Sequence, residues 1–124
     1  MAVTLKSQRE IDMMRRAGEI AAKVLQIGGE AVRPGVTTKH INDVMHKFIK
    51  SQNATPNFLG YGGFPGVACI SVNDEVIHGI PSGRVLTDGD IVSIDVGVLL
   101  NGYHSDTAAT FPCGNVSDEA KKLI

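Results

Sequence analysis

The sequence lacks the features that mark nucleic-acid-binding, membrane and secreted proteins. Its net charge is −1, from 12 basic and 13 acidic residues, and it has no basic block and no acidic tail. No apolar run is long enough to cross a bilayer, and the start, MAVTLKSQRE, has no signal-peptide core. Low-complexity segments and internal repeats are also missing. We therefore expect one globular domain over residues 1–124, with neither nucleic acid nor membrane as a partner.

Cysteine is scarce in this chain. The two cysteines, Cys69 and Cys113, lie far apart in the sequence and form no CxxC pair. Two reduced thiols explain them best, which predicts a cytoplasmic protein rather than a secreted one.

The residues that are present predict two helices followed by an antiparallel sheet. SQRE at Ser7–Glu10 has the form of a capping box, and apolar or small residues follow it at helical spacing as far as Gly28. A second amphipathic helix follows RPGVTT, with a threonine as its N-cap. Strand patterns cover Val67–Val72, Glu75–Pro81 and two later runs, and SDEAKKLI is typical of a helix start. The expected fold class is therefore α+β, with two helices packed on an antiparallel sheet and a third helix truncated at its start.

The clearest local signal lies in IVSIDVGVLLNGYHSDTAATF, residues 91–111. Asn101-Gly102 between apolar runs favours a two-residue type I′ turn, which needs positive φ at both positions. This turn sets Gly97 opposite Asp106, and the alternation of side chains places Asp95 on the same face as both. The two aspartates become diagonal neighbours, roughly 7–8 Å apart at the backbone. Because Gly97 has no side chain, the point on which their carboxylates converge is unblocked.

Two converging carboxylates repel each other unless they share a proton or hold a cation. The first arrangement is that of acid proteases, which need a different flanking pattern such as Asp-Thr-Gly. The second favours a divalent ion that accepts oxygen ligands, such as Mn²⁺, Fe²⁺ or Co²⁺. The alternative is a solvated sheet face, on which Ser93, His104 and Thr110 also point to water. A register slip of one residue would also move the aspartates to opposite faces.

These motifs resemble those of the type I methionine aminopeptidases, the pita-bread metallopeptidases. The similarity runs over nearly the whole chain, through RPGVTT, GYGGFPG, CISVNDEVIHGIP and LTDGDIVSIDVGVLLNGYHSDTAATF, in that order. The family's catalytic domain contains two similar halves. The resemblance therefore implies the amino-terminal half of a pita-bread fold.

The resemblance also implies roles for particular residues. Two divalent metal ions (Co, Mn, Fe or Zn) would be bound by Asp95 and by Asp106, which bridges them. A histidine and two glutamates of the family's second half would complete the site. His78 would bind the substrate by hydrogen-bonding the scissile peptide, although without the resemblance a structural hydrogen bond beside a strand end explains this histidine better. Core packing is likewise the alternative for the aromatic members of the implied methionine pocket, which draws on Phe58, Tyr61, Phe64 and Cys69.

The function implied by the resemblance is metal-assisted hydrolysis that removes the N-terminal methionine from peptides and nascent proteins. Because the other metal ligands belong to the family's second half, the isolated chain is expected to be weakly active or inactive. Gly62 departs from the family's GYxGFP loop, where relatives usually carry a polar residue. One alternative is a non-catalytic half-domain that forms a homodimer or pairs with a complementing second half. Another is a regulatory protein, against which the joint presence of Asp95, Asp106 and His78 argues.

Overall fold

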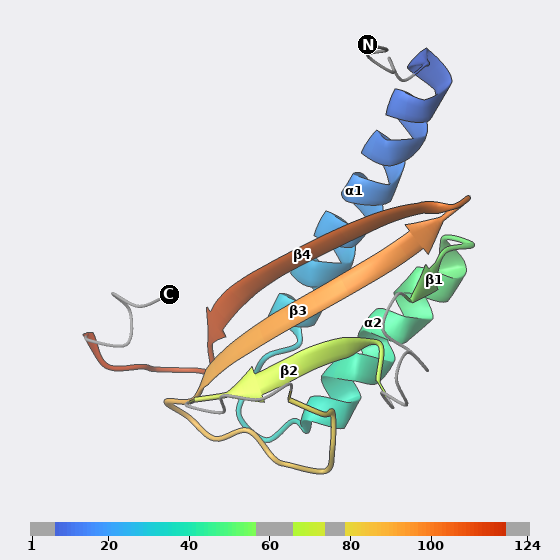
Figure 1. The fold of residues 1–124 in the computed structure, drawn as a ribbon. Coiled ribbons are helices and arrows are strands. Elements are labelled where there is room, and N and C mark those ends of the chain that lie inside the picture. Colours follow the sequence, from blue (N-terminus) through green and yellow to red (C-terminus); the bar gives the residue numbers. More distant parts are fainter. Residues whose placement is uncertain (1–6, 57–65, 74–78, 119–124) are drawn as a thin grey trace.

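The computed structural model describes residues 7–56, 66–73 and 79–118. Two helices, α1 (Gln8–Glu30) and α2 (Thr38–Ser51), come first in the chain. An antiparallel sheet of four strands follows, made of β1 (Thr55–Pro56), β2 (Ala68–Val72), β3 (Ile91–Leu100) and β4 (Tyr103–Pro112). Both helices lie on the same side of the sheet (Figure 1). The expected α+β arrangement, with two helices on an antiparallel sheet, is confirmed.

The two helices begin where their capping residues predict. Ser7 Oγ accepts a hydrogen bond from Glu10 N at 3.2 Å, and the Glu10 carboxylate accepts one from Ser7 N at 3.4 Å. This reciprocal capping box satisfies two of the amides that have no partner within the helix. Thr37 caps α2, because its Oγ1 accepts a hydrogen bond from His40 N at 3.0 Å.

The β3–β4 hairpin forms with the predicted turn and the predicted register. Asn101 has a φ of 51° and Gly102 a φ of 85°, as a type I′ turn requires. The predicted cross-strand pairs are all present: Leu100 with Tyr103, Val98 with Ser105, Gly97 with Asp106, and Asp95 with Ala108. The two aspartates are therefore diagonal neighbours on one face of the sheet.

The other strand pairings are not evident from the sequence. β3 lies in the middle of the sheet, and both β2 and the two-residue β1 pair with its other edge. The strand expected over Glu75–Pro81 falls mostly outside the described residues, and its described end, residues 79–81, forms no strand. Nevertheless, Ile70 N donates to Gly79 O at 2.8 Å, so Gly79 lies beside β2. Of the expected third helix, only the first helical residue, Asp118, is described.

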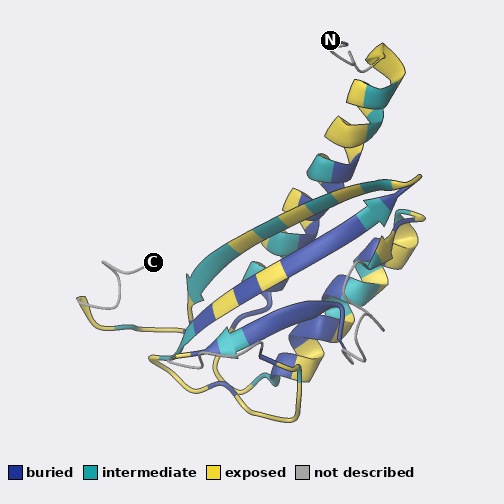
Figure 2. Cartoon of the chain, in the orientation of Figure 1, coloured by how far each residue is buried: buried dark blue, intermediate teal, exposed yellow. Residues whose placement is uncertain are grey.

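The hydrophobic core lies between the helices and the sheet. Along β3, buried and exposed residues alternate from Val92 to Val96, whereas β4 alternates between half-buried and exposed residues from Tyr103 to Ala108 (Figure 2). The buried β3 residues pack with the apolar faces of both helices, and Met45 of α2 lies against Gly28 of α1. The opposite face of the sheet, here called the open face, carries Cys69, Ser71, Ser93, Asp95, Gly97, Leu99, His104, Asp106, Ala108 and Thr110.

The glycines of α1 allow the helix to lie close to the sheet, and two of them make a matched test. In Gly29→Ala the new Cβ would overlap the Phe111 ring, lying 2.6 Å from its Cζ. We expect this change to lower the free energy of unfolding by about 1–3 kcal/mol, because the rigid ring has to move. In Gly18→Ala the nearest heavy atom is Ser105 Oγ at 3.8 Å, so no contact is strained. That variant should gain up to about 1 kcal/mol from helix propensity.

Urea unfolding of the two variants and the wild type measures both effects. A change of the same sign in the two variants would contradict the close approach of α1 and β4.

Candidate metal centre

Asp95 and Asp106 lie on the open face, exposed and turned away from the helices. Gly97 lies directly across from Asp106, and Ala108 lies directly across from Asp95. Neither of these two residues extends beyond Cβ, so the space between the carboxylates is not occupied by a side chain of β3 or β4. The hairpin therefore presents the two carboxylates as diagonal neighbours on this face, next to a buried Gly97.

Cys69 of β2 pairs with Asp95 of β3 and lies on the same face of the sheet. β2 pairs with the edge of β3 that is opposite β4. Burial, and then the negative charge of Asp95, raise the pKa of the Cys69 thiol, which keeps it protonated at neutral pH. A protonated, buried sulfur behaves as a small apolar group rather than as a metal ligand. This location agrees with a role in lining an apolar pocket beside the carboxylates.

Hydroxyl groups occupy the next row of the open face. Ser93 Oγ and Thr110 Oγ1 lie 3.1 Å apart in a hydrogen bond across β3 and β4, and Ser71 pairs with Ser93 from β2. Polar residues thus line the sheet on the side of Asp95 away from Asp106. His104, two residues before Asp106 on the same face, is exposed.

The two carboxylates fit a divalent cation as donors but do not enclose one. Ionised carboxylates are the oxygen ligands that Mn²⁺ and similar ions accept. Within residues 7–56, 66–73 and 79–118, no group of three or more His, Cys, Asp or Glu side chains gathers around a common point. Catalytic metals typically have three protein ligands, so the two carboxylates alone do not make a complete site.

Asn42 and Thr38 of α2, which the sequence did not single out, hold two loop segments to the helix by hydrogen bonds. Asn42 Oδ1 accepts a hydrogen bond from Val67 N at 2.8 Å, just before β2. Thr38 Oγ1 accepts from Ser82 N at 2.8 Å and donates to Ser82 O at 3.2 Å. Both side chains are almost fully buried. The sequence signal that could have identified Asn42 is its position as a polar residue within the apolar stripe of α2.

The remaining expected site residues cannot be placed. His78, Phe58, Tyr61 and Phe64 lie outside the described residues. Their assignment to the substrate site remains a prediction from the sequence.

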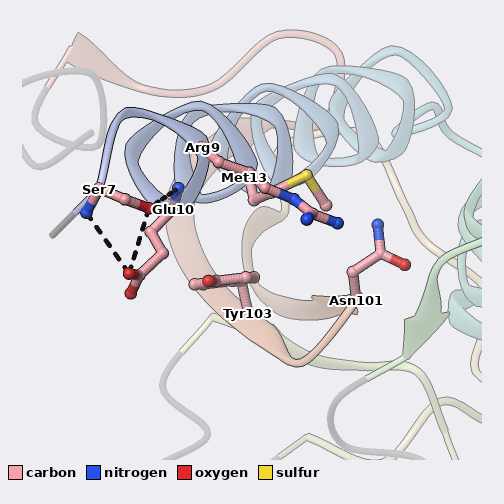
Figure 3. A pocket seen from close by; sticks show the side chains of 6 residues that line it. All are labelled: Ser7, Arg9, Glu10, Met13, Asn101 and Tyr103. Carbon is pink, nitrogen blue, oxygen red and sulfur yellow. Dashed lines mark hydrogen bonds between the residues drawn. The ribbon is translucent and has the colours of Figure 1, made fainter.

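A cavity of about 540 Å³ lies elsewhere, between the start of α1 and the hairpin turn (Figure 3). Glu10 in its wall is engaged in the capping box, and Tyr103 belongs to the helix side of β4 because it alternates with His104. The cavity therefore opens on the opposite side of the sheet from the carboxylates. Its lining consists of Ser7, Arg9, Glu10, Met13, Asn101 and Tyr103.

Among the described helices, none is both long and apolar enough to span a bilayer.

Comparison with known proteins identifies the family. The model of metallopeptidase family M24 matches residues 12–124. The chain belongs to this family. It is 50% identical over 122 residues to methionine aminopeptidase 1 of Bacillus subtilis, and 54% identical over 122 residues to the methionine aminopeptidase of Clostridium perfringens. In both comparisons the match covers 98% of this chain and 49% of the relative.

The fold matches that of a solved relative. The crystal structure of methionine aminopeptidase from Rickettsia prowazekii superposes with a TM-score of 0.92 at 42% sequence identity. The match covers 99% of this chain and 50% of that protein. The chain thus spans about half the length of the relatives it matches. The expected half of a pita-bread fold is confirmed.

The pairing of Cys69 with Asp95 gives a test of the open face. In Asp95→Asn the loss of the negative charge should lower the pKa of the Cys69 thiol, because that charge raises it in the wild type. More thiolate at a given pH should make alkylation by iodoacetamide a few-fold faster. Mass spectrometry of timed samples from neutral to alkaline pH measures the rate at each cysteine.

Cys113 is the internal control. Its pKa is raised by burial and by Asp90 and Asp88, not by Asp95, so its rate should not change. An unchanged rate at Cys69 would show that the Asp95 charge does not reach the thiol.

Proposed function

We propose that this chain provides the half of a methionine aminopeptidase that carries two carboxylate metal ligands, Asp95 and Asp106. The reaction is removal of the N-terminal methionine from peptides and nascent proteins. The observation that carries this proposal is the placement of two exposed aspartates as diagonal neighbours on one sheet face. It is supported by membership in family M24 and by the methionine aminopeptidase relatives.

In this proposal Asp95 and Asp106 would together hold the divalent ions. Co, Mn, Fe or Zn ions bound there would supply Lewis-acid polarisation of the scissile carbonyl and a nucleophile at neutral pH. The chain itself binds and orients the substrate. His78 donates a hydrogen bond to the scissile peptide. Phe58, Tyr61, Phe64 and Cys69 enclose the methionine side chain, whose thioether favours contact with aromatic rings.

The isolated 124-residue chain is proposed to be weakly active or inactive. Two carboxylates are fewer than the three protein ligands that a catalytic metal typically has. The chain covers 49% of the length of its Bacillus relative, so the remaining ligands are assigned to the part of the fold that this half does not contain. The reduced state of both cysteines supports a cytoplasmic site of action.

A chimera provides the test of this function. Residues 1–124 are joined to the second half of the Bacillus subtilis relative, with which this chain shares 50% identity. The chimera should release methionine from a Met-Ala peptide in the presence of Mn²⁺ or Co²⁺. Asp106→Asn and Asp95→Asn should each lower kcat/KM by roughly 100-fold or more, because each removes a metal ligand.

The isolated chain is assayed in parallel and should show little or no release. Metal-dependent release by the isolated chain, lost in Asp106→Asn, would contradict the half-site. A folded, active chimera that tolerates both substitutions would contradict the assignment of the metal ligands.

Self-association without catalysis is the second candidate function, and the sheet edge favours it. Among the described strands, β4 pairs with β3 alone, so one edge of a strand ten residues long has no strand partner. Such an edge can pair with another chain, and a two-fold axis would place two copies of β4 antiparallel. Between Tyr103 and Phe111, the strand carries no lysine, arginine or proline that would disfavour such pairing.

Sedimentation velocity over a range of protein concentrations tests this second function. The wild type should form a dimer, and Thr110→Lys, which adds a charge to the edge strand, should shift it toward monomer. A wild-type monomer at every concentration would eliminate self-association.

A further inference from the structure

Two buried polar side chains lie one turn apart on α2. Thr38 is 2% exposed and Asn42 is 8% exposed, and among the described residues no other polar or charged residue is as deeply buried. A polar group in an apolar core is costly unless hydrogen bonds replace its contacts with water. Both side chains bond to backbone groups that are far from α2 in the sequence. Their partners therefore show what the two residues are needed for.

Asn42 holds the point at which the chain returns to the sheet after β1. β1 ends at Pro56 and β2 begins at Ala68, and their partners in β3 are two residues apart on the same edge. The chain thus leaves β3 and comes back to it about 7 Å further along, although residues 57–67 lie between. At the returning end, Asn42 Oδ1 accepts a hydrogen bond from Val67 N at 2.8 Å. Strand pairing fixes one end of this stretch, and Asn42 fixes the other.

Thr38 holds the segment that follows His78 in the sequence. Its Oγ1 accepts a hydrogen bond from Ser82 N at 2.8 Å and donates one to Ser82 O at 3.2 Å. At the other end of this segment, Ile70 N donates to Gly79 O at 2.8 Å. The segment is therefore fixed between β2 and the first turn of α2.

The two segments that α2 holds also contact each other. A Cβ on Gly66 would lie 2.8 Å from Pro81 Cγ, which is closer than carbon atoms approach without strain, and 3.1 Å from Asn42 Oδ1. Glycine at this position allows the backbone to pack directly against the proline ring. Thr38, Asn42, Gly66 and Pro81 form what is here called the α2 junction.

We propose that Thr38 and Asn42 are positioning residues, which hold two substrate-contacting segments at a fixed separation. This inference rests on the proposed function, in which Phe64 lines the methionine pocket and His78 bonds the scissile peptide. Phe64 precedes Gly66 by two positions, and His78 directly precedes the segment that Thr38 holds. Since a misplacement of about 1 Å can cost on the order of 100-fold in rate, the α2 junction affects both contacts.

Steady-state kinetics of the chimera with the Bacillus subtilis second half separate the two anchors. Asn42→Leu keeps the approximate shape of the side chain but leaves Val67 N without its acceptor. With Mn²⁺ present, KM for a Met-Ala peptide should rise roughly tenfold at nearly constant kcat, because a methionine pocket binds ground state and transition state alike. Thr38→Val removes the hydroxyl group and should lower kcat roughly tenfold at nearly constant KM, because His78 acts on the scissile peptide.

Amide hydrogen exchange in the full 124-residue chain measures the anchors without catalysis. Exchange at Val67 N should become roughly tenfold faster in Asn42→Leu, and exchange at Ser82 N should do so in Thr38→Val, because each amide loses its acceptor. Each variant should leave the amides of β3 close to wild type. This pattern shows that a segment has been released while the sheet stays folded.

Matched variants distinguish positioning from stability. Thr38→Ser and Asn42→Asp keep an oxygen that accepts from the same amide, and they should restore most of the lost kcat and KM. Ile49→Val shortens a buried side chain at the far end of α2. It should lower the urea unfolding midpoint and leave KM, and kcat per folded enzyme, unchanged. Gly66→Ala forces the two segments apart without removing either anchor, so it should raise KM and lower kcat, and it replaces any anchor variant that does not fold.

The possible outcomes distinguish this inference from the proposed function. Wild-type KM and kcat in both anchor variants, with exchange accelerated at Val67 N and Ser82 N, would overturn the positioning role and leave the proposed function standing. A loss of activity that Ile49→Val reproduces at equal stability would also overturn it. A folded wild-type chimera that releases no methionine would overturn the proposed function and the positioning role together.

Discussion

The register of the β3–β4 hairpin is the constraint on which the candidate metal centre depends. Asp95 and Asp106 are 11 positions apart in the chain and share a face only because the turn at Asn101-Gly102 contains two residues. A slip of one residue would bury one carboxylate under the helices and leave the other on the open face. The positive φ values of Asn101 and Gly102 oppose such a slip from within the turn. The alternation of Val92, Ile94 and Val96 with polar residues opposes it from within the core.

Much of this arrangement could be predicted from the sequence because its determinants are local. The cap at Ser7, the cap at Thr37 and the Asn-Gly turn each depend on residues within four positions of one another. The pairing of Cys69 with Asp95 could not be predicted in the same way, since it joins strands 26 positions apart through segments without a regular pattern. The alternation of residues along a strand shows which side chains share a face of the sheet. Which of the two faces is covered depends on where the helices pack.

The same limit explains what the sequence missed about the site. Asn42 stands among apolar residues of α2, and its role appears only when Val67 N is found beside it.

The openness of the sheet face also governs how strongly the carboxylates need a cation. In water, two unit charges 4 Å apart interact by about 1 kcal/mol, so exposed aspartates tolerate each other without a metal ion. Covering the open face with a second layer of protein would remove that solvation, and the same pair would then be costly unless a cation or a proton neutralised it. Burial and metal affinity are thereby linked. The described residues present the two carboxylates, and a layer over the open face would favour a bound cation or proton between them.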